Sequence, residues 1–225
     1  MTDARSEILE RIRQALPQAY LPAVVEQVPV PPAPPPFARP LAEVFAAALA
    51  DMRGELHRLP DRPAAREFLQ AEFKRRQVTQ LLCWDAERWP DPGLAAYLKV
   101  DHIELVASRL PGLRRKQDLQ RLSSIEVGLT GADAGLARTG SLVLVGSREQ
   151  GRLASLMPPV HYALLRVDLL YPDLAAWLAA PGIHEKIAAS SSTVVITGPS
   201  RTADIAQTLT LGAHGPRELH VVLIG

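Results

Sequence analysis

Two histidines stand in short, stiff loops where an imidazole could take part in chemistry. His161 follows Pro158-Pro159-Val160, and His214 precedes Gly215-Pro216. A ring held in a rigid turn is suited to proton transfer, so both are candidate catalytic residues. The alternative is that each ring only supports its turn through hydrogen bonds. A metal site built on the two rings lacks the usual ligand spacing, and none is predicted.

The segment Thr197–Asp204 has the composition of an anion-binding loop. It leaves an apolar run, and a helix is expected directly after it, over Ala203–Leu211. Glycine permits close approach of the backbone, threonine caps a helix, and free N–H groups with an arginine attract an anion. A plain capped turn, with Arg201 paired to an acid, is the competing interpretation. The predicted ligand-binding residues are Gly198, Ser200, Arg201, Thr202 and Asp204.

A second loop runs from Thr130 to Ser141, with glycines on either side of a small-residue segment, Ala132–Ala137, that is expected to be helical. Small side chains leave room for a ligand, so Thr139, Gly140 and Ser141 complete the predicted ligand-binding set. No nucleotide-binding glycine motif and no nucleophile-elbow motif is present. This loop alone is weak evidence for a ligand site, and it supports one only together with the histidine loops and the Thr197–Asp204 segment.

The elements that position these loops alternate between strand and helix. Short apolar runs predict strands buried on both faces, and the stretches between them predict helices. Ligands of an open parallel sheet bind outside the carboxyl ends of its strands. We therefore predict an α/β fold with a mostly parallel sheet covered by helices. The strands are expected at Val78–Trp84, Ile103–Ala107, Leu142–Val145, Tyr162–Val167, Thr193–Ile196 and Leu219–Ile224, and the helices at Gly93–Leu98, Gly151–Leu156 and Leu174–Ala180.

The first 40 residues have a different character. Ile8, Ile12 and Leu16 recur at helical spacing, and nine prolines follow between positions 17 and 40. Such a segment favours polyproline II over a hydrogen-bonded ladder. We expect an N-terminal helix and proline-rich arm over 1–40 and an α/β domain over 41–225, opening with helices near Leu41–Met52 and after Asp61.

Charge and cysteine content narrow the class of protein. The formal net charge is +1, with 25 basic and 24 acidic residues, which argues against nucleic-acid binding. Cys83 is the single cysteine and lies in an apolar run, so a buried structural role is expected and no iron–sulfur cluster is predicted on this chain. No apolar run has the length of a membrane span, and cytoplasmic residence is the expectation.

Five segments together resemble the LUD-domain family, and within it the lactate utilization protein C group. They are Val127–Thr130, Ala137–Ser141, Leu156–His161, Gly198–Ile205 and Gly212–Pro216. The resemblance is close over 123–225 and loose before that. It implies a fold like that of the sugar-phosphate isomerases and CoA transferases, and a role in oxidising lactate to pyruvate with two iron–sulfur partner proteins.

The resemblance leaves the chemistry of this chain open. Lactate, pyruvate or another small anion is the expected ligand, and either histidine could assist removal of the hydroxyl proton of lactate. Glu126 or Asp133 would serve instead as nucleophile or base in an independent CoA transferase or phosphosugar isomerase. A third possibility is a non-catalytic regulatory or assembly module. Arg138 stands where the family often has an acid, and either orients its loop or adds positive charge to the pocket.

Overall fold

The computed structural model describes residues 4–19, 34–109, 115–203, 209–211 and 215–225. The chain divides into two units, Met1–Pro35 and Pro36–Gly225. The first contains a helix with no buried residue and a short 3₁₀ turn. In chain order the elements are α1 (Ala4–Ala15), η1 (Leu16–Gln18), α2 (Leu41–Asp51), β1 (Glu55–Leu59), α3 (Arg62–Arg75), β2 (Gln80–Cys83), η2 (Ala86–Arg88), α4 (Leu94–Val100), β3 (Glu104–Ala107), α5 (Arg115–Leu122), β4 (Val127–Gly131), β5 (Ala134–Leu136), β6 (Ser141–Gly146), α6 (Leu153–Leu156), β7 (Val160–Arg166), η3 (Val167–Leu169), β8 (Leu170–Tyr171), α7 (Leu174–Leu178), α8 (Ile183–Ala188), β9 (Ser192–Ile196), β10 (Arg201–Ala203), β11 (Leu209–Leu211) and β12 (Glu218–Ile224).

A six-stranded parallel sheet forms the centre of the second unit. Its strand order is β1-β12-β7-β4-β2-β3, and every neighbouring pair is parallel. The middle strands β4, β7 and β12 are buried almost throughout, as expected for strands covered on both faces. This arrangement confirms the predicted α/β fold with a mostly parallel sheet.

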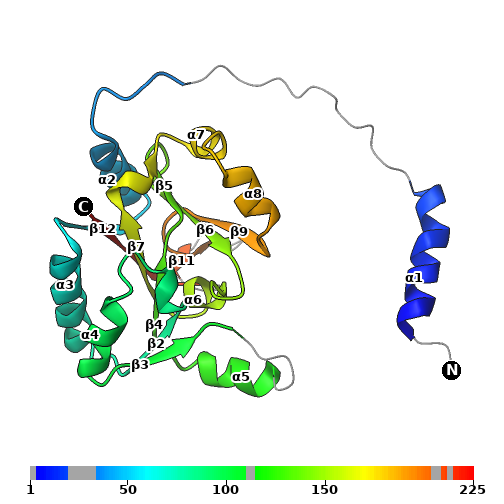
Figure 1. Ribbon diagram of the computed structural model, residues 1–225, viewed down its shortest axis with the longest axis horizontal. Coiled ribbons are helices and arrows are strands. Elements are labelled where there is room, and N and C mark those ends of the chain that lie inside the picture. The colour runs from blue at the N-terminus through cyan, green and yellow to red at the C-terminus, as the bar shows by residue number, and fades with distance from the viewer. Residues whose placement is uncertain (1–3, 20–33, 110–114, 204–208, 212–214) are drawn as a thin grey trace. The chain divides into compact units, whose positions relative to one another are not determined.

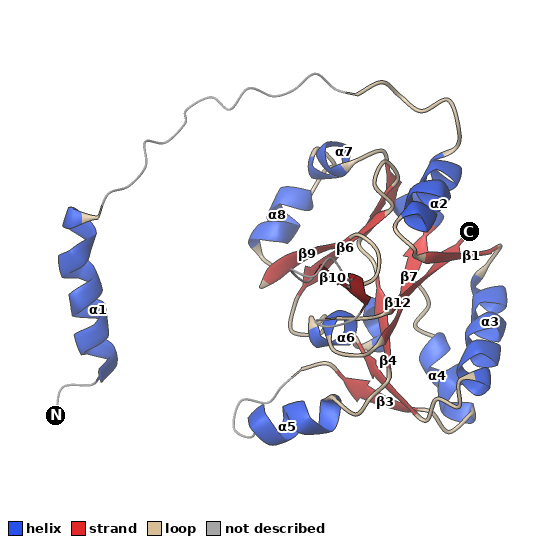
Figure 2. Ribbon diagram, turned by 180° about the vertical axis from the view of Figure 1, so that it is seen from behind, coloured by secondary structure: helices blue, strands red, loops and turns tan. Residues whose placement is uncertain are grey.

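Helices and a second sheet cover the two faces of the parallel sheet. α3 packs against β1 and β12 on one face, and α4 lies beside α3 (Figure 1). On the other face lie α6 and a four-stranded mixed sheet, ordered β8-β5-β6-β9. α7 and α8 lie beside this smaller sheet in both views (Figure 2), where they enclose a second apolar cluster around Trp177.

Most of the predicted elements are present, but one was assigned the wrong structure and another has strand instead of helix at its described ends. The expected helix over Ala132–Ala137 is the strand β5. Its Gly135 lies so close to Leu165 and Leu170 that a Cβ would be 2.6 Å from the former, and an extended backbone fits this narrow space. The expected helix over Ala203–Leu211 is bordered by the antiparallel strands β10 and β11, and residues 204–208 lie outside the described part.

Two strands predicted for the parallel sheet belong to the smaller one. β6 is fully buried but pairs antiparallel with both β5 and β9. β9 alternates between half-buried and exposed residues, because one of its faces is open to solvent. Neither feature follows from the apolar composition that predicted the strands, since composition does not reveal which strands pair.

The start of α3 shows how local sequence places an element. Asp61 has an extended backbone and its Oδ1 accepts a hydrogen bond from the Ala64 amide at 2.9 Å, while Pro63 occupies the first turn. We expect Asp61→Ala to lower the free energy of unfolding by about 1 kcal/mol, because an amide of the first turn loses its acceptor. Chemical denaturation checks this. Asp61→Ser is the control that keeps an acceptor, and equal losses for both variants would contradict a capping role.

Candidate functional site

A cavity of about 210 Å³ brings together residues from three of the loops singled out in the sequence. His161, Gly198 and Ser200 line it, together with Thr197, Gly215 and the apolar side chains of β9 and β12. Drug-sized ligands occupy sites of roughly 300–1,000 Å³. The space is therefore that of a small metabolite rather than a nucleotide.

His161 is the titratable side chain of the cavity wall and is completely buried. Burial, with a smaller effect from His220, lowers its pKa to about 3, so the ring is neutral at physiological pH. Its Nε2 lies 2.9 Å from the Thr130 hydroxyl on the neighbouring strand β4. Nδ1 is buried and has no hydrogen-bond partner among the described residues. Buried polar atoms of native proteins usually have a partner, so this nitrogen is a candidate contact for a ligand or a water molecule.

A row of hydroxyl groups leads from the Thr139 loop to the cavity. Thr139 Oγ1 lies 2.7 Å from Ser141 Oγ, which lies 2.7 Å from Thr197 Oγ1. Thr197 lines the cavity, so the predicted residues Thr139 and Ser141 reach it only through this third hydroxyl. Gly140 has φ +63° and packs against the backbone of α2.

The Gly198–Arg201 segment makes a turn held by backbone contacts rather than a helix N-terminus. Ser200 N donates to Pro216 O at 2.8 Å, and Gly198 has φ +80° beside the Met52 carbonyl. Arg201 is exposed and its guanidinium also donates to Met52 O. Thr202 lies in β10, so it does not cap a helix there. Asp204 and His214 lie outside the described residues.

The cavity lies at the opposite end of the parallel strands from the one we expected. His161 and Leu219 are near the beginnings of β7 and β12, so this is the amino edge of the six-stranded sheet. The carboxyl edge has a separate cleft of about 300 Å³. Its cations are paired with acids: Arg166 with Asp168, Lys186 with Asp133, and Arg88 with Glu149.

Other candidate residues have structural partners. Both Asp133 oxygens are engaged, one by Lys186 at 2.5 Å and one by the Val145 amide at 2.7 Å. Glu126 is exposed. Arg138 lies 3.5 Å from Asp173 and over the Phe37 ring, which supports its role in orienting the loop. Cys83 is buried, and burial raises the pKa of its thiol to about 12, as expected for a structural cysteine.

Sequence reasoning missed two polar residues of the site. Thr130 faces His161 from β4, and Thr197 joins the hydroxyl row to the cavity. Thr130 was placed in a loop, because the glycines around it concealed the strand Val127–Gly131. The alternation of side chains along β4 and β7, once the strands are known, brings Thr130 and His161 to the same face.

Comparison with known structures agrees with this fold. A crystal structure of a DUF162 family protein from Deinococcus radiodurans superposes with a TM-score of 0.58 and 22% identity, over 82% of this chain and 96% of that one. This likeness concerns the fold. The chain is thus an α/β protein with a small cavity beside its parallel sheet.

Sequence comparison identifies the family. Residues 42–224 match the LUD domain, and the chain belongs to the LUD domain family. An uncharacterized protein of Neisseria meningitidis serogroup B is 40% identical over 45% of this chain and 43% of its own. Lactate utilization protein C of Anoxybacillus flavithermus is 31% identical over 61% of this chain and 60% of its own length. Lactate utilization protein C of Bacillus velezensis is 26% identical over 82% of this chain and 71% of its own length. The match spans less than two thirds of the length of the Neisseria meningitidis and Anoxybacillus flavithermus proteins.

Among the described residues, no helix is long and apolar enough to cross a membrane.

Proposed function

We propose that this chain is a component of a lactate utilization system that binds lactate or pyruvate in the cavity beside His161. The observation that carries the proposal is the buried, neutral His161 in the wall of a 210 Å³ cavity, in a chain whose relatives include lactate utilization proteins C. The volume suits a three-carbon acid.

The chemistry of the wall supports recognition of a small hydroxy or keto acid. A neutral imidazole donates from one nitrogen and accepts at the other. With Nε2 on Thr130, the second nitrogen would be left to the ligand, and Thr197 and Ser200 line the same cavity. His161 would hold the ligand and take part in proton transfer, while Arg201, Thr202, Asp204 and His214 remain proposed contributors.

The transfer of electrons from lactate would take place on iron–sulfur partner proteins. Cluster ligation uses several cysteine thiolates, and this chain has one cysteine, whose thiol is buried with a raised pKa. The chain would act in the cytoplasm beside those partners, binding the ligand without a redox group of its own.

Thermal unfolding of the purified full chain tests ligand binding. Lactate or pyruvate at about 100 times its dissociation constant should add about 2.7 kcal/mol of stability, a rise of several degrees in the unfolding midpoint. His161→Asn should weaken binding at least tenfold. His184→Ala, an exposed histidine on α8, is the control and should bind as wild type.

Reconstitution tests the metabolic role separately. Omitting this chain from a mixture with its iron–sulfur companions should stop lactate oxidation, and adding it back should restore it. An unchanged rate on omission would overturn the proposal. So would an equal thermal shift with acetate, because the cavity would then recognise a carboxylate without regard to the lactate hydroxyl or the pyruvate carbonyl.

A further inference from the structure

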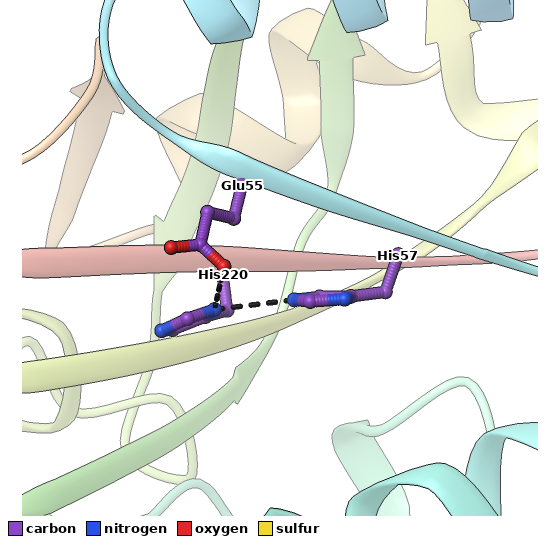
Figure 3. A group of neighbouring side chains, drawn as sticks. All are labelled: Glu55, His57 and His220. Carbon is purple, nitrogen blue, oxygen red and sulfur yellow. Dashed lines mark hydrogen bonds and ion pairs between the residues drawn. The ribbon is translucent and has the colours of Figure 1, made fainter.

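A second cluster of titratable side chains lies on the opposite face of the parallel sheet from the cavity. Side chains alternate along a strand, so His161 and Tyr162 of β7 face opposite ways. The Tyr162 face is covered by α3, and here Glu55 and His57 of β1 meet His220 of β12. Figure 3 shows the three side chains converging from two adjacent strands.

The geometry of this cluster is that of a metal ligand set. His57 Nε2 lies 3.1 Å from His220 Nδ1, and Glu55 Oε2 lies 3.3 Å from the same nitrogen. Ligand atoms about 2.1 Å from a tetrahedral metal lie about 3.4 Å from one another. All three ligand atoms lie within 4.8 Å of each other, so small side-chain rotations would suffice to surround one ion.

The surroundings of His220 provide the second shell that a metal-bound imidazole requires. Its other ring nitrogen, Nε2, lies 3.1 Å from Glu218 Oε2, and Arg76 holds this carboxylate at 2.6 Å. A carboxylate that accepts the remote N–H fixes the tautomer and makes the ligating nitrogen more basic. Tyr162 stacks on the same ring, with centroids 4.5 Å apart, and fixes its orientation.

The charge balance also favours a cation. Three carboxylates, Glu55, Glu72 and Glu218, face two guanidiniums, Arg75 and Arg76, which leaves a net formal charge of −1 when the histidines are neutral.

Hydrogen bonding alone gives a competing account of the contacts. A single proton on His220 Nδ1 would be shared between His57 Nε2 and the Glu55 carboxylate, and Arg76 would donate to His220 Nε2 at 3.1 Å. That arrangement divides one proton between two acceptors. In the other tautomer, His57 Nε2 donates to His220 Nδ1 and His220 Nε2 donates to Glu218, while the exposed Glu55 carboxylate is hydrated. A divalent ion would instead satisfy all three ligand atoms at once, and metal titration distinguishes the two arrangements.

We infer that Glu55, His57 and His220 form a binding site for a divalent transition metal of the zinc class. Two imidazoles and one carboxylate suit Zn²⁺ and its neighbours rather than Mg²⁺ or Ca²⁺, which prefer oxygen ligands. Glu55 is 65% exposed on the edge strand β1, so ions enter from solvent. Three protein ligands leave the fourth tetrahedral position to water, as in catalytic zinc sites.

Titration of the chelator-treated full chain with Zn²⁺, in competition with a chromophoric chelator, tests the inference. Wild type should bind one equivalent, and Glu55→Gln and His57→Asn should each weaken binding at least tenfold. Glu55 is exposed, so Glu55→Gln should unfold at the wild-type temperature without metal. His184→Ala is the control for surface histidines and should keep both stoichiometry and affinity.

Spectroscopy separates this site from adventitious binding. Co²⁺ should give the visible absorption of a tetrahedral complex in wild type and in His184→Ala, and lose it in His57→Asn. The inference is overturned if wild type and the two ligand variants bind Zn²⁺ equally, or if excess Mg²⁺ displaces the ion. Neither result would bear on the lactate cavity, since no ligand of this cluster lines it.

Discussion

Gly140→Ala should lower the free energy of unfolding by about 3 kcal/mol. Gly140 has φ +63°, a conformation that costs an alanine roughly 1–2 kcal/mol. A Cβ there would lie 2.3 Å from Leu49 N and 2.6 Å from Ala48 C, both backbone atoms of α2. Because a helix backbone yields less readily than a side chain, overpacking adds roughly another 1–3 kcal/mol. Chemical denaturation measures the sum.

Gly182→Ala separates the cost of the positive φ angle from the cost of overpacking. Gly182 also has positive φ, +77°, but a Cβ there would meet nothing within 4 Å. This variant should lose only the conformational part, about 1 kcal/mol. If the two variants lost the same amount, α2 would be free to move away from the loop. The close packing of Gly140 against α2 would then add nothing to the stability.

The sequence predicted the parallel sheet well because its strands have a clear composition. Tyr162–Val167 and Leu219–Ile224 are apolar without alternation, and both proved to be central strands. β1 was missed, because Glu55, His57 and Arg58 make it a polar edge strand. β4 was missed because its two glycines, Gly128 and Gly131, are typical of loops. Gly128 is required there, since a Cβ would lie 1.9 Å from the Ala154 carbonyl.

Three of the predicted site residues lie together, but at an unexpected place in the fold. His161, Gly198 and Ser200 do meet around one cavity. The rule that ligands bind at the carboxyl ends of parallel strands placed them at the wrong edge, because the Gly198 loop follows β9, which pairs antiparallel with β6 in the smaller mixed sheet. A sequence does not show which of two sheets a strand joins, and this choice decides which end of the larger sheet the loop reaches.

The histidine cluster escaped prediction for a related reason. Glu55 and His57 are two residues apart, the spacing that puts both on one face of a strand. Because β1 was not predicted as a strand, this spacing gave no sign that the two side chains share a face. His220 lies 163 residues beyond His57, so the sequence did not connect them either. Only the parallel pairing of β1 with β12 brings the residues together.

Glu72 should make the stability of the protein depend on acid pH. The hydrogen bonds from Arg75, opposed by burial and assisted by the Tyr162 hydroxyl at 2.9 Å, lower the pKa of this carboxyl to about 2. Its side chain is 18% exposed. A pKa below the ordinary value of 4.5 means that folding favours the carboxylate. The stabilisation is therefore complete above pH 4.5 and is lost as the pH falls through 2.

Glu72→Gln should accordingly destabilise the protein by about 2–3 kcal/mol at pH 7, the magnitude of hydrogen bonds to a charged group. The difference from wild type should shrink as the pH falls from 4.5 toward 2, because the wild-type carboxyl is then protonated as well. Urea denaturation at a series of pH values measures both effects. Tyr162→Phe should show a smaller loss, since the arginine contacts remain.

Glu67→Gln is the matched control for the pH dependence. Glu67 lies on the same helix, α3, but is exposed, so its loss should change the stability little at any pH. A Glu72→Gln variant whose deficit stayed constant down to pH 2 would contradict the ionic origin of the effect. The loss would then come from the altered hydrogen bonds of the amide, which has the same size as the carboxyl group, and the charge of Glu72 would contribute nothing to the stability.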